Sequence, residues 1–237
     1  MENKISYKDI KDVQIWYRVA GMSFALLLFV GIILFFSINQ SFVEETQYIL
    51  LVLSTILYIT VPTLMHLFLS AKSSSPALLE EMNKETNRYR WLEFFFSSSI
   101  MVLTLGILIG ITSSLELSIL AGMNAIMILF GAFADLAKQT WQKIVFFGVS
   151  GAVFTTIWLI LIRRYIEITG GGVSSALSDG TFSQLMLILV LFCTFPLFFL
   201  IQHFSGLKIR YTTIDKLYIL AGFVTKASLF MITLIRL

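Results

Sequence analysis

The sequence contains little cysteine and little charge, and each shortage excludes a class of protein. Cys193 is the single cysteine in 237 residues, so neither an intramolecular disulfide nor a cysteine metal site can form. Only 13% of the residues are charged, compared with about 25% in soluble domains. Together with 57% hydrophobic residues and a mean hydropathy of +0.88, this excludes an ordinary water-soluble domain.

Long uncharged stretches occupy most of the chain. Six of them lack Asp, Glu, Lys and Arg, and a seventh, from Leu217 to Ile235, contains only Lys226. Each can cross a hydrocarbon core of roughly 30 Å as a helix that rises about 1.5 Å per residue. We therefore predict an all-α membrane protein that forms one seven-transmembrane helix bundle over residues 1–237. The expected spans are about 18–43, 47–71, 88–114, 117–137, 142–164, 181–205 and 213–236.

Lysine and arginine are distributed unevenly over the ends of these spans. If the N-terminus is inside, thirteen of them lie in inside segments and three, Arg163, Arg164 and Arg236, lie outside. Loop lysines and arginines resist translocation, so the pattern predicts an N-terminus inside and a C-terminus outside. The net charge of +3 then reflects orientation in a cell membrane, and it gives no reason to expect binding to nucleic acid.

The longest inside connection, Lys72 to Tyr89, is expected to contain a short interfacial helix. Ser75 is its predicted N-cap and Pro76 its first-turn proline. Leu78, Leu79 and Met82 follow at helical spacing.

Lys226 lies near the middle of the seventh span, where a lysine costs about 2.5 to 3.5 kcal/mol even on the lower insertion scale. Three roles would offset that cost. The deprotonated amine could form a Schiff base with an aldehyde, the lysine could relay protons, or it could belong to a structural ion pair. Its position alone does not choose among them.

Glu93 is the one carboxylate that the sequence places at depth near Lys226. It shares a helix face with Ser97, Met101 and Thr104, so this face offers an acid, a hydroxyl and a soft apolar surface. The alternative is that Glu93 pairs with Arg90 near the interface and that the serines serve helix packing.

Two further spans contribute candidate residues. His66 in the second span could share a proton with such a site, or could simply be a hydrogen-bonded packing residue. In the fourth span Asn124, Met127 and Gly131 share one face, which would suit a polyene or close helix packing equally well.

Three of these segments, in order, resemble the heliorhodopsins, a family of retinal proteins inverted in the membrane relative to the ion-pumping microbial rhodopsins. The third-span run Arg90-Trp91-Leu92-Glu93 with Ser97-Ser98-Ser99-Ile100-Met101 is similar to the family's counterion and triple-serine signature. The run Asn124 to Gly131 resembles its fourth-span block, and Leu217-Tyr218-Ile219 through Thr225-Lys226-Ala227-Ser228 resembles its last helix.

The resemblance implies all-trans retinal bound covalently as a protonated Schiff base on Lys226, with Glu93 as its counterion and His66 nearby. It also implies a homodimer. The pocket walls that it implies are Phe94, Ser98, Met101, Asn124, Met127 and Gly131. Spans five and six match more weakly, and there Trp158, Phe195 and Phe199 are the expected residues beside the retinal ring.

Departures from the family pattern predict a thinner polar network around the Schiff base. Phe24 stands where the family often has a first-span histidine, and Gly222 replaces a usual serine one turn before Lys226. The loop Asn39 to Gln47 is shorter than the family's outer loop, which places a family-like dimer cap in doubt.

We therefore predict a light-sensing retinal photoreceptor that signals to an unknown cytoplasmic partner without pumping ions. The sequence shows no second buried carboxylate that could donate a proton across from Glu93. The alternatives are a light-gated proton or cation channel and a retinal-free membrane transporter. An enzyme is not expected, since no nucleophile with its base, no metal cluster and no phosphate-binding glycine loop is found.

Overall fold

A computed structural model describes residues 5–37, 45–170, 180–207 and 209–236, and these residues form helices without strands. Seven helices are long and apolar enough to cross a membrane. They are α1 (Tyr7–Ser37), α2 (Glu45–Ser70), α4 (Arg88–Leu108), α5 (Ser114–Leu136), α6 (Thr140–Thr169), α8 (Gly180–Phe204) and α9 (Tyr211–Arg236). The predicted seven-helix bundle is confirmed, and each helix overlaps its expected span.

A short 3-10 turn, η1 (Lys72–Ser74), and the short helix α3 (Ser75–Asn83) connect α2 to α4, as expected for this segment. The predicted cap was wrong by one residue, because Ser74 is the N-cap and Ser75 already belongs to α3. The Ser75 hydroxyl instead donates a hydrogen bond to Gln14 Oε1 at 3.0 Å. That end of the bundle is called the α3 end below.

The first helix begins at Tyr7, well before the predicted start near residue 18. Ile10, Val13 and Tyr17 are buried in one cluster with Leu78 and Met82 of α3. The N-terminal segment is therefore amphipathic. Its apolar side packs against α3, and this contact explains why the helix starts before the predicted span.

The third span ends at Leu108, six residues before the predicted end at 114. Gly110 has a φ of +94°, and the amide of Ile111 donates to the carbonyl of Gly106 at 2.9 Å. This left-handed glycine closes the helix as in a Schellman motif.

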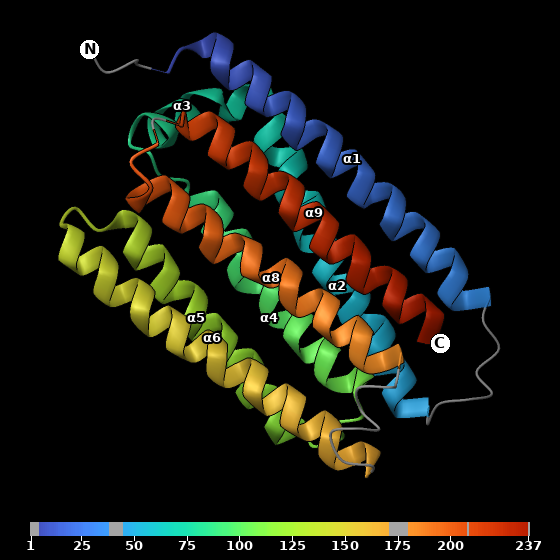
Figure 1. Ribbon diagram of the computed structural model, residues 1–237. Coiled ribbons are helices and arrows are strands. Elements are labelled where there is room, and N and C mark those ends of the chain that lie inside the picture. Colours follow the sequence, from blue (N-terminus) through green and yellow to red (C-terminus); the bar gives the residue numbers. More distant parts are fainter. Residues whose placement is uncertain (1–4, 38–44, 171–179, 208, 237) are drawn as a thin grey trace.

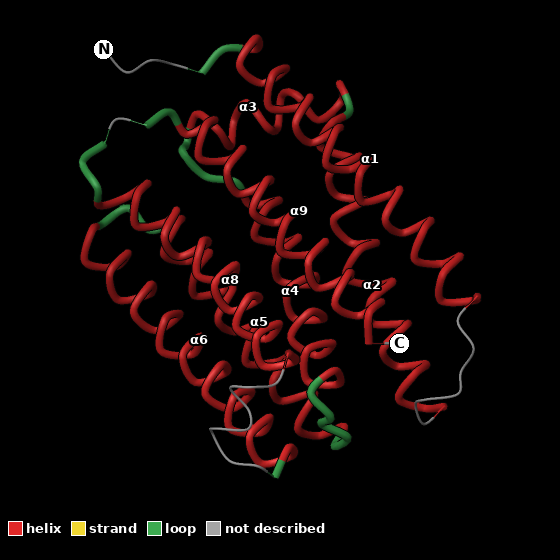
Figure 2. Tube along the Cα trace, turned by 45° about the vertical axis from the view of Figure 1, so that its right-hand side comes forward, coloured by secondary structure: helices red, strands yellow, loops and turns green. Residues whose placement is uncertain are grey.

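The helices form a ring that can be followed in two views (Figures 1 and 2). Neighbours around the ring are α1, α2, α4, α5 and α6 on one side, and α1, α9 and α8 on the other. The ring closes between α6 and α8, which touch only sparsely. Large apolar side chains such as Met22, Phe29 and Leu64 are exposed on the outside, as expected of a surface that faces lipid.

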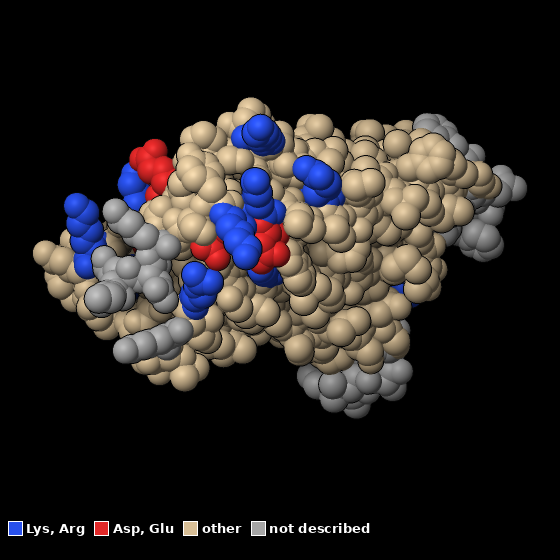
Figure 3. Space-filling model, turned by 90° about the horizontal axis from the view of Figure 1, so that it is seen from above, with Lys and Arg blue, Asp and Glu red and all other residues tan. Residues whose placement is uncertain are grey.

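Basic side chains are concentrated at the α3 end (Figure 3). Seen from above Figure 1, lysines and arginines outnumber the acidic side chains on this face. Several of them are paired: Arg88 with Glu81, Arg210 with Asp9, and Lys216 with Asp12.

Candidate functional site

Lys226 and Glu93 meet in the interior of the bundle. Lys226 Nζ lies 3.1 Å from Glu93 Oε1, and the two side chains are 4% and 2% exposed. Glu93 Oε1 also accepts a hydrogen bond from the Ser97 hydroxyl at 2.6 Å. The amine lies 5.1 Å from the ring centre of Phe94 and 5.9 Å from that of Phe24. A lysine and a glutamate are therefore paired with one hydroxyl among aromatic rings.

A small polar cavity adjoins this pair on the side of the α3 end. Its volume is about 10 Å³, and His66 and Gly222 line it together with Tyr17, Glu93 and Lys226. His66 is buried, and its Nδ1 has no hydrogen-bond partner among the described residues. The space approaches the size that one water molecule needs. His66 thus lies beside the pair without a direct hydrogen bond to it.

Gly222 leaves free space next to the amine. A Cβ at this position would lie 3.6 Å from Lys226 Nζ and 3.7 Å from the Phe94 ring, which is ordinary contact. The glycine therefore offers no hydroxyl where a serine would fit.

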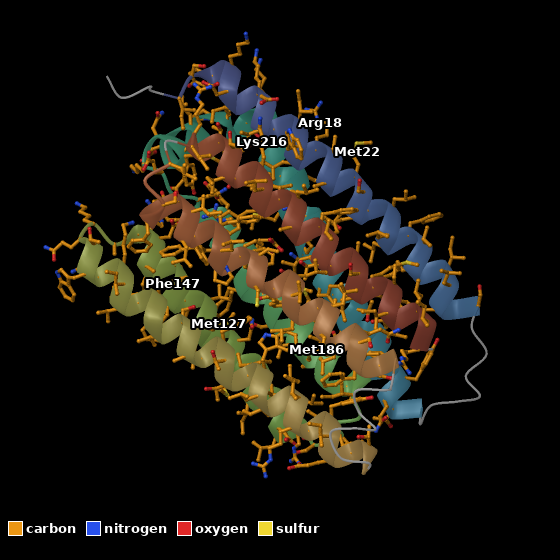
Figure 4. The ribbon with its side chains drawn as sticks, viewed as in Figure 1. Arg18, Met22, Met127, Phe147, Met186 and Lys216 are labelled. Carbon is orange, nitrogen blue, oxygen red and sulfur yellow. The ribbon has the colours of Figure 1, made fainter. Side chains whose placement is uncertain are left out.

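A larger, mostly apolar cavity of about 120 Å³ lies on the other side of Lys226. Met127 of α5 and Phe147 of α6, both labelled in Figure 4, contribute to its wall. Of the residues expected to line a retinal pocket, Phe94, Ser98, Met101, Met127, Gly131, Phe195, Phe199 and Lys226 do so. The sequence reasoning missed Trp91, Ile128, Phe147, Ser150, Gly151, Phe154, Phe192, Pro196, Tyr218 and Thr225.

Asn124 and Trp158, which were expected on this wall, lie outside its lining, and so does Ser97. Ser97 faces Glu93, and Asn124 donates to the Ser98 hydroxyl at 2.8 Å and to that of Ser99 at 3.2 Å. Trp158 packs against Phe192 at a ring distance of 5.7 Å, behind the wall. These side chains hold the wall in place without forming its surface.

Gly131 allows α5 to approach the Trp91 ring closely. A Cβ at residue 131 would lie 2.9 Å from the nearest ring atom of Trp91, which is too close without a shift. The glycine thus makes room for an indole that lines the apolar cavity.

Toward the α3 end lies a buried ionic cluster that the sequence reasoning did not anticipate. Arg90 pairs with Asp135 and with Asp215, each at 3.2 Å, and all three side chains are at most 4% exposed. Glu93 is thus not the only buried carboxylate, although it is the one beside Lys226. Asp135 and Asp215 stand near the ends of their helices, where a single sequence suggests contact with water.

Hydrogen bonds extend this cluster to both cavities. Asp215 accepts from the Tyr17 hydroxyl at 2.7 Å and from Asn87 at 2.8 Å. Trp91 Nε1 donates to Asp135 at 2.7 Å. Helical spacing offered a signal, because Asp215, Tyr218, Gly222 and Lys226 recur at three- and four-residue intervals on one face of α9.

Solved structures similar to this chain are microbial rhodopsins. The rhodopsin of Exiguobacterium sibiricum matches with a TM-score of 0.74 at 13% identity, covering 95% of each chain. Xanthorhodopsin, described as a light-driven ion pump with a dual chromophore, gives 0.76 at 14% identity, covering 97% of this chain and 93% of its own. Halorhodopsin from Halobacterium salinarum gives 0.73 at 16% identity, with 96% and 93% covered. At these identities the likeness establishes a shared fold.

A search of curated protein sequences gives no match. The family model named Heliorhodopsin matches residues 36–235, which is most of the chain. The protein is therefore an integral multi-pass membrane protein of the retinal photoreceptor type, and it belongs to the heliorhodopsin family.

Proposed function

We propose that this protein is a light sensor in which Lys226 Nζ binds all-trans retinal as a Schiff base, with Glu93 as the counterion. The observation that carries the proposal is the position of Lys226. Its amine lies 3.1 Å from a buried carboxylate and lines an apolar cavity. A nucleophilic amine at the end of an apolar cavity fits a long hydrophobic aldehyde.

The residues of the larger cavity fit retinal by their chemistry. Aromatic and aliphatic side chains from α4, α5, α6, α8 and α9 surround the space, and the hydroxyls of Ser98, Ser150 and Thr225 bond to backbone carbonyls. The wall thus presents little unsatisfied polarity to a polyene. When bound, retinal supplies absorption of visible light and a change of shape on isomerisation.

Glu93 would keep the Schiff base protonated. Its carboxylate stabilises a positive charge on the Lys226 nitrogen, and the Ser97 hydroxyl holds that carboxylate in place. His66 lines the small polar cavity, and its Nδ1 has no hydrogen-bond partner among the described residues, so it could exchange a proton through one water molecule there.

We further propose signalling without pumping. Among the described residues the buried carboxylates are Glu81, Glu93, Asp135 and Asp215, and each lies between Lys226 and the α3 end. A pump that moves protons across the bundle would need acids on both sides of the amine. We infer that the α3 end faces the cytoplasm, where a signalling partner would bind, and that the protein forms a homodimer.

A light-gated proton conductor is the second candidate, and two hydroxyls favour it. The hydroxyls of Thr55 and Tyr58 are buried toward the end opposite α3, next to each other and to Thr233. Water bound there would extend a polar path from Lys226 toward that face. A photocurrent under voltage clamp separates this function from a pure sensor.

We propose no enzymatic role for this site. The described residues contain no group of three His, Cys, Asp or Glu that could hold a metal ion. One similar structure is the transmembrane domain of a rhodopsin phosphodiesterase from Salpingoeca rosetta, and its likeness here concerns the fold of that domain.

The decisive experiment is the visible spectrum of the protein expressed with all-trans retinal, beside Lys226→Ala. We expect a visible band in the wild type and none in the variant. A folded wild type that stays colourless would overturn the proposal and favour a retinal-free transporter built on the Lys226 and Glu93 pair.

A further inference from the structure

Lys143, His203 and Asp135 meet at the α3 end of the seam between α6 and α8. His203 Nε2 lies 3.1 Å from Asp135 Oδ1, and Lys143 Nζ lies 3.4 Å from His203 Nδ1. Lys143 Nζ is also 3.3 Å from the backbone carbonyl of Asp135. These contacts link α5, α6 and α8 where α6 and α8 otherwise touch little.

An aromatic layer lies directly beneath this polar one. Phe147 is one turn from Lys143 on α6, and Phe199 is one turn from His203 on α8. Their rings stack with centres 4.7 Å apart and planes 6° from parallel. Phe199 also contacts the His203 ring at 4.5 Å. Both phenylalanines line the larger cavity, so the polar layer closes the seam next to the cavity wall.

A hydrogen bond between Lys143 Nζ and His203 Nδ1 contains a single proton, so only one of the two nitrogens can be the donor. When the ammonium of Lys143 donates, Nδ1 must be bare, and the imidazole is neutral with its Nε2–H directed at Asp135. A second proton would place an imidazolium against an ammonium. Histidine is the side chain that gains such a proton between about pH 8 and 5.

The charged groups that face this cluster come from several elements. Arg90 and Lys143 are positive, and Asp135 and Asp215 are negative. Glu85, in the connection before α4, also attracts the Lys143 ammonium. Protonated His203 keeps its carboxylate partner, whereas the half-buried Lys143 is free to turn toward water.

We propose that Lys143, His203 and Asp135 form a proton-binding site that fastens α6 to α8, and that uptake of one proton by His203 releases Lys143 and loosens the seam. The proton comes from water at the α3 end and stays on His203 Nδ1. The Phe147 and Phe199 stack transmits the change to the cavity wall. The proposal does not depend on bound retinal.

The test measures the separation of the two helices in retinal-free protein in lipid nanodiscs. Spin labels are placed on Ile144→Cys of α6 and Leu200→Cys of α8, both exposed to lipid, in a Cys193→Ser background. Pulsed electron–electron distances are recorded from pH 8 to pH 5. We expect one short distance at pH 8 and a longer-distance population that grows as the pH falls to 5.

Variants assign the effect to this site. His203→Gln keeps a polar side chain that does not titrate, and should remove the pH dependence. Lys143→Met removes the repelled charge, and its distances should also be independent of pH. Lys138→Met removes a lysine from the exposed neighbouring loop and should behave as the wild type. A wild-type distance that stays constant with pH, or an equal change in His203→Gln, would overturn the proposal.

Discussion

At the scale of single residues, the buried charges of Lys226 and Glu93 compensate each other, so the cost of burying either one depends on the presence of the other. Removing one partner of a buried ion pair typically costs about 3 to 5 kcal/mol, because the remaining charge has no partner. Removing both charges costs much less. Retinal-free Lys226→Met and Glu93→Gln should each unfold at lower temperature than the wild type, and the double variant should recover most of the loss.

Thermal unfolding in detergent, followed by circular dichroism, measures this coupling in a double-mutant cycle. Arg163→Met, which removes a surface charge paired with Glu167, is a control that should change stability by less than about 1 kcal/mol. Additive losses in the double variant would show that the two side chains do not form a coupled pair.

Gly131 is a residue where a single added methyl group should matter. Alanine there would place Cβ 2.9 Å from Trp91, whose indole is held by Asp135 and so cannot retreat freely. We expect Gly131→Ala to destabilise the protein by roughly 1 to 3 kcal/mol through overpacking, and to shift the visible band of the retinal-loaded protein.

Gly122→Ala on the same helix is the matched control. A Cβ at residue 122 meets no atom within 4 Å, so alanine should leave the band in place and stabilise α5 by about 0.5 to 1 kcal/mol. Unchanged stability and colour in Gly131→Ala would mean that the Trp91 ring shifts without cost.

At the scale of helices, the sequence predicted positions well and ends less well. Uncharged stretches located each span because the cost of charge in lipid is large and local. The start of α1 at Tyr7 depends on burial against α3, a contact between distant segments that a local pattern does not contain. Asp135 and Asp215 were missed for the same reason, since their partner Arg90 comes from a third helix.

The end of α4 offers a test of its own. Gly110 has a φ of +94°, where an L side chain is strained, so Gly110→Ala should destabilise the protein by about 1 to 2 kcal/mol. Gly148→Ala, in the interior of α6 with open space around its Cβ, should not destabilise. Equal effects of the two variants on the unfolding temperature would show that Gly110 does not close the helix.

At the scale of the whole molecule, the ring of helices has one weak closure, between α6 and α8. The larger cavity lies against that closure, with α6 residues such as Phe147 and Phe154 facing Phe192 and Phe199 of α8. A change of shape inside the cavity therefore acts first on the seam with the fewest contacts to resist it. A sensor that moves α8 relative to α6 would use this geometry, and the polar layer at the α3 end is where the motion would reach water.

Orientation in the membrane decides which compartment that polar layer meets. The basic residues at the α3 end predict that it faces the cytoplasm, because lysine and arginine in short loops resist translocation. In a Cys193→Ser background, a cysteine replacing Arg163 near the end of α6 should react with a membrane-impermeant maleimide on intact cells. A cysteine replacing Lys8 at the start of α1 should react only after the cells are opened. The reverse pattern would place the Lys143 and His203 site outside the cell, where it would respond to external pH.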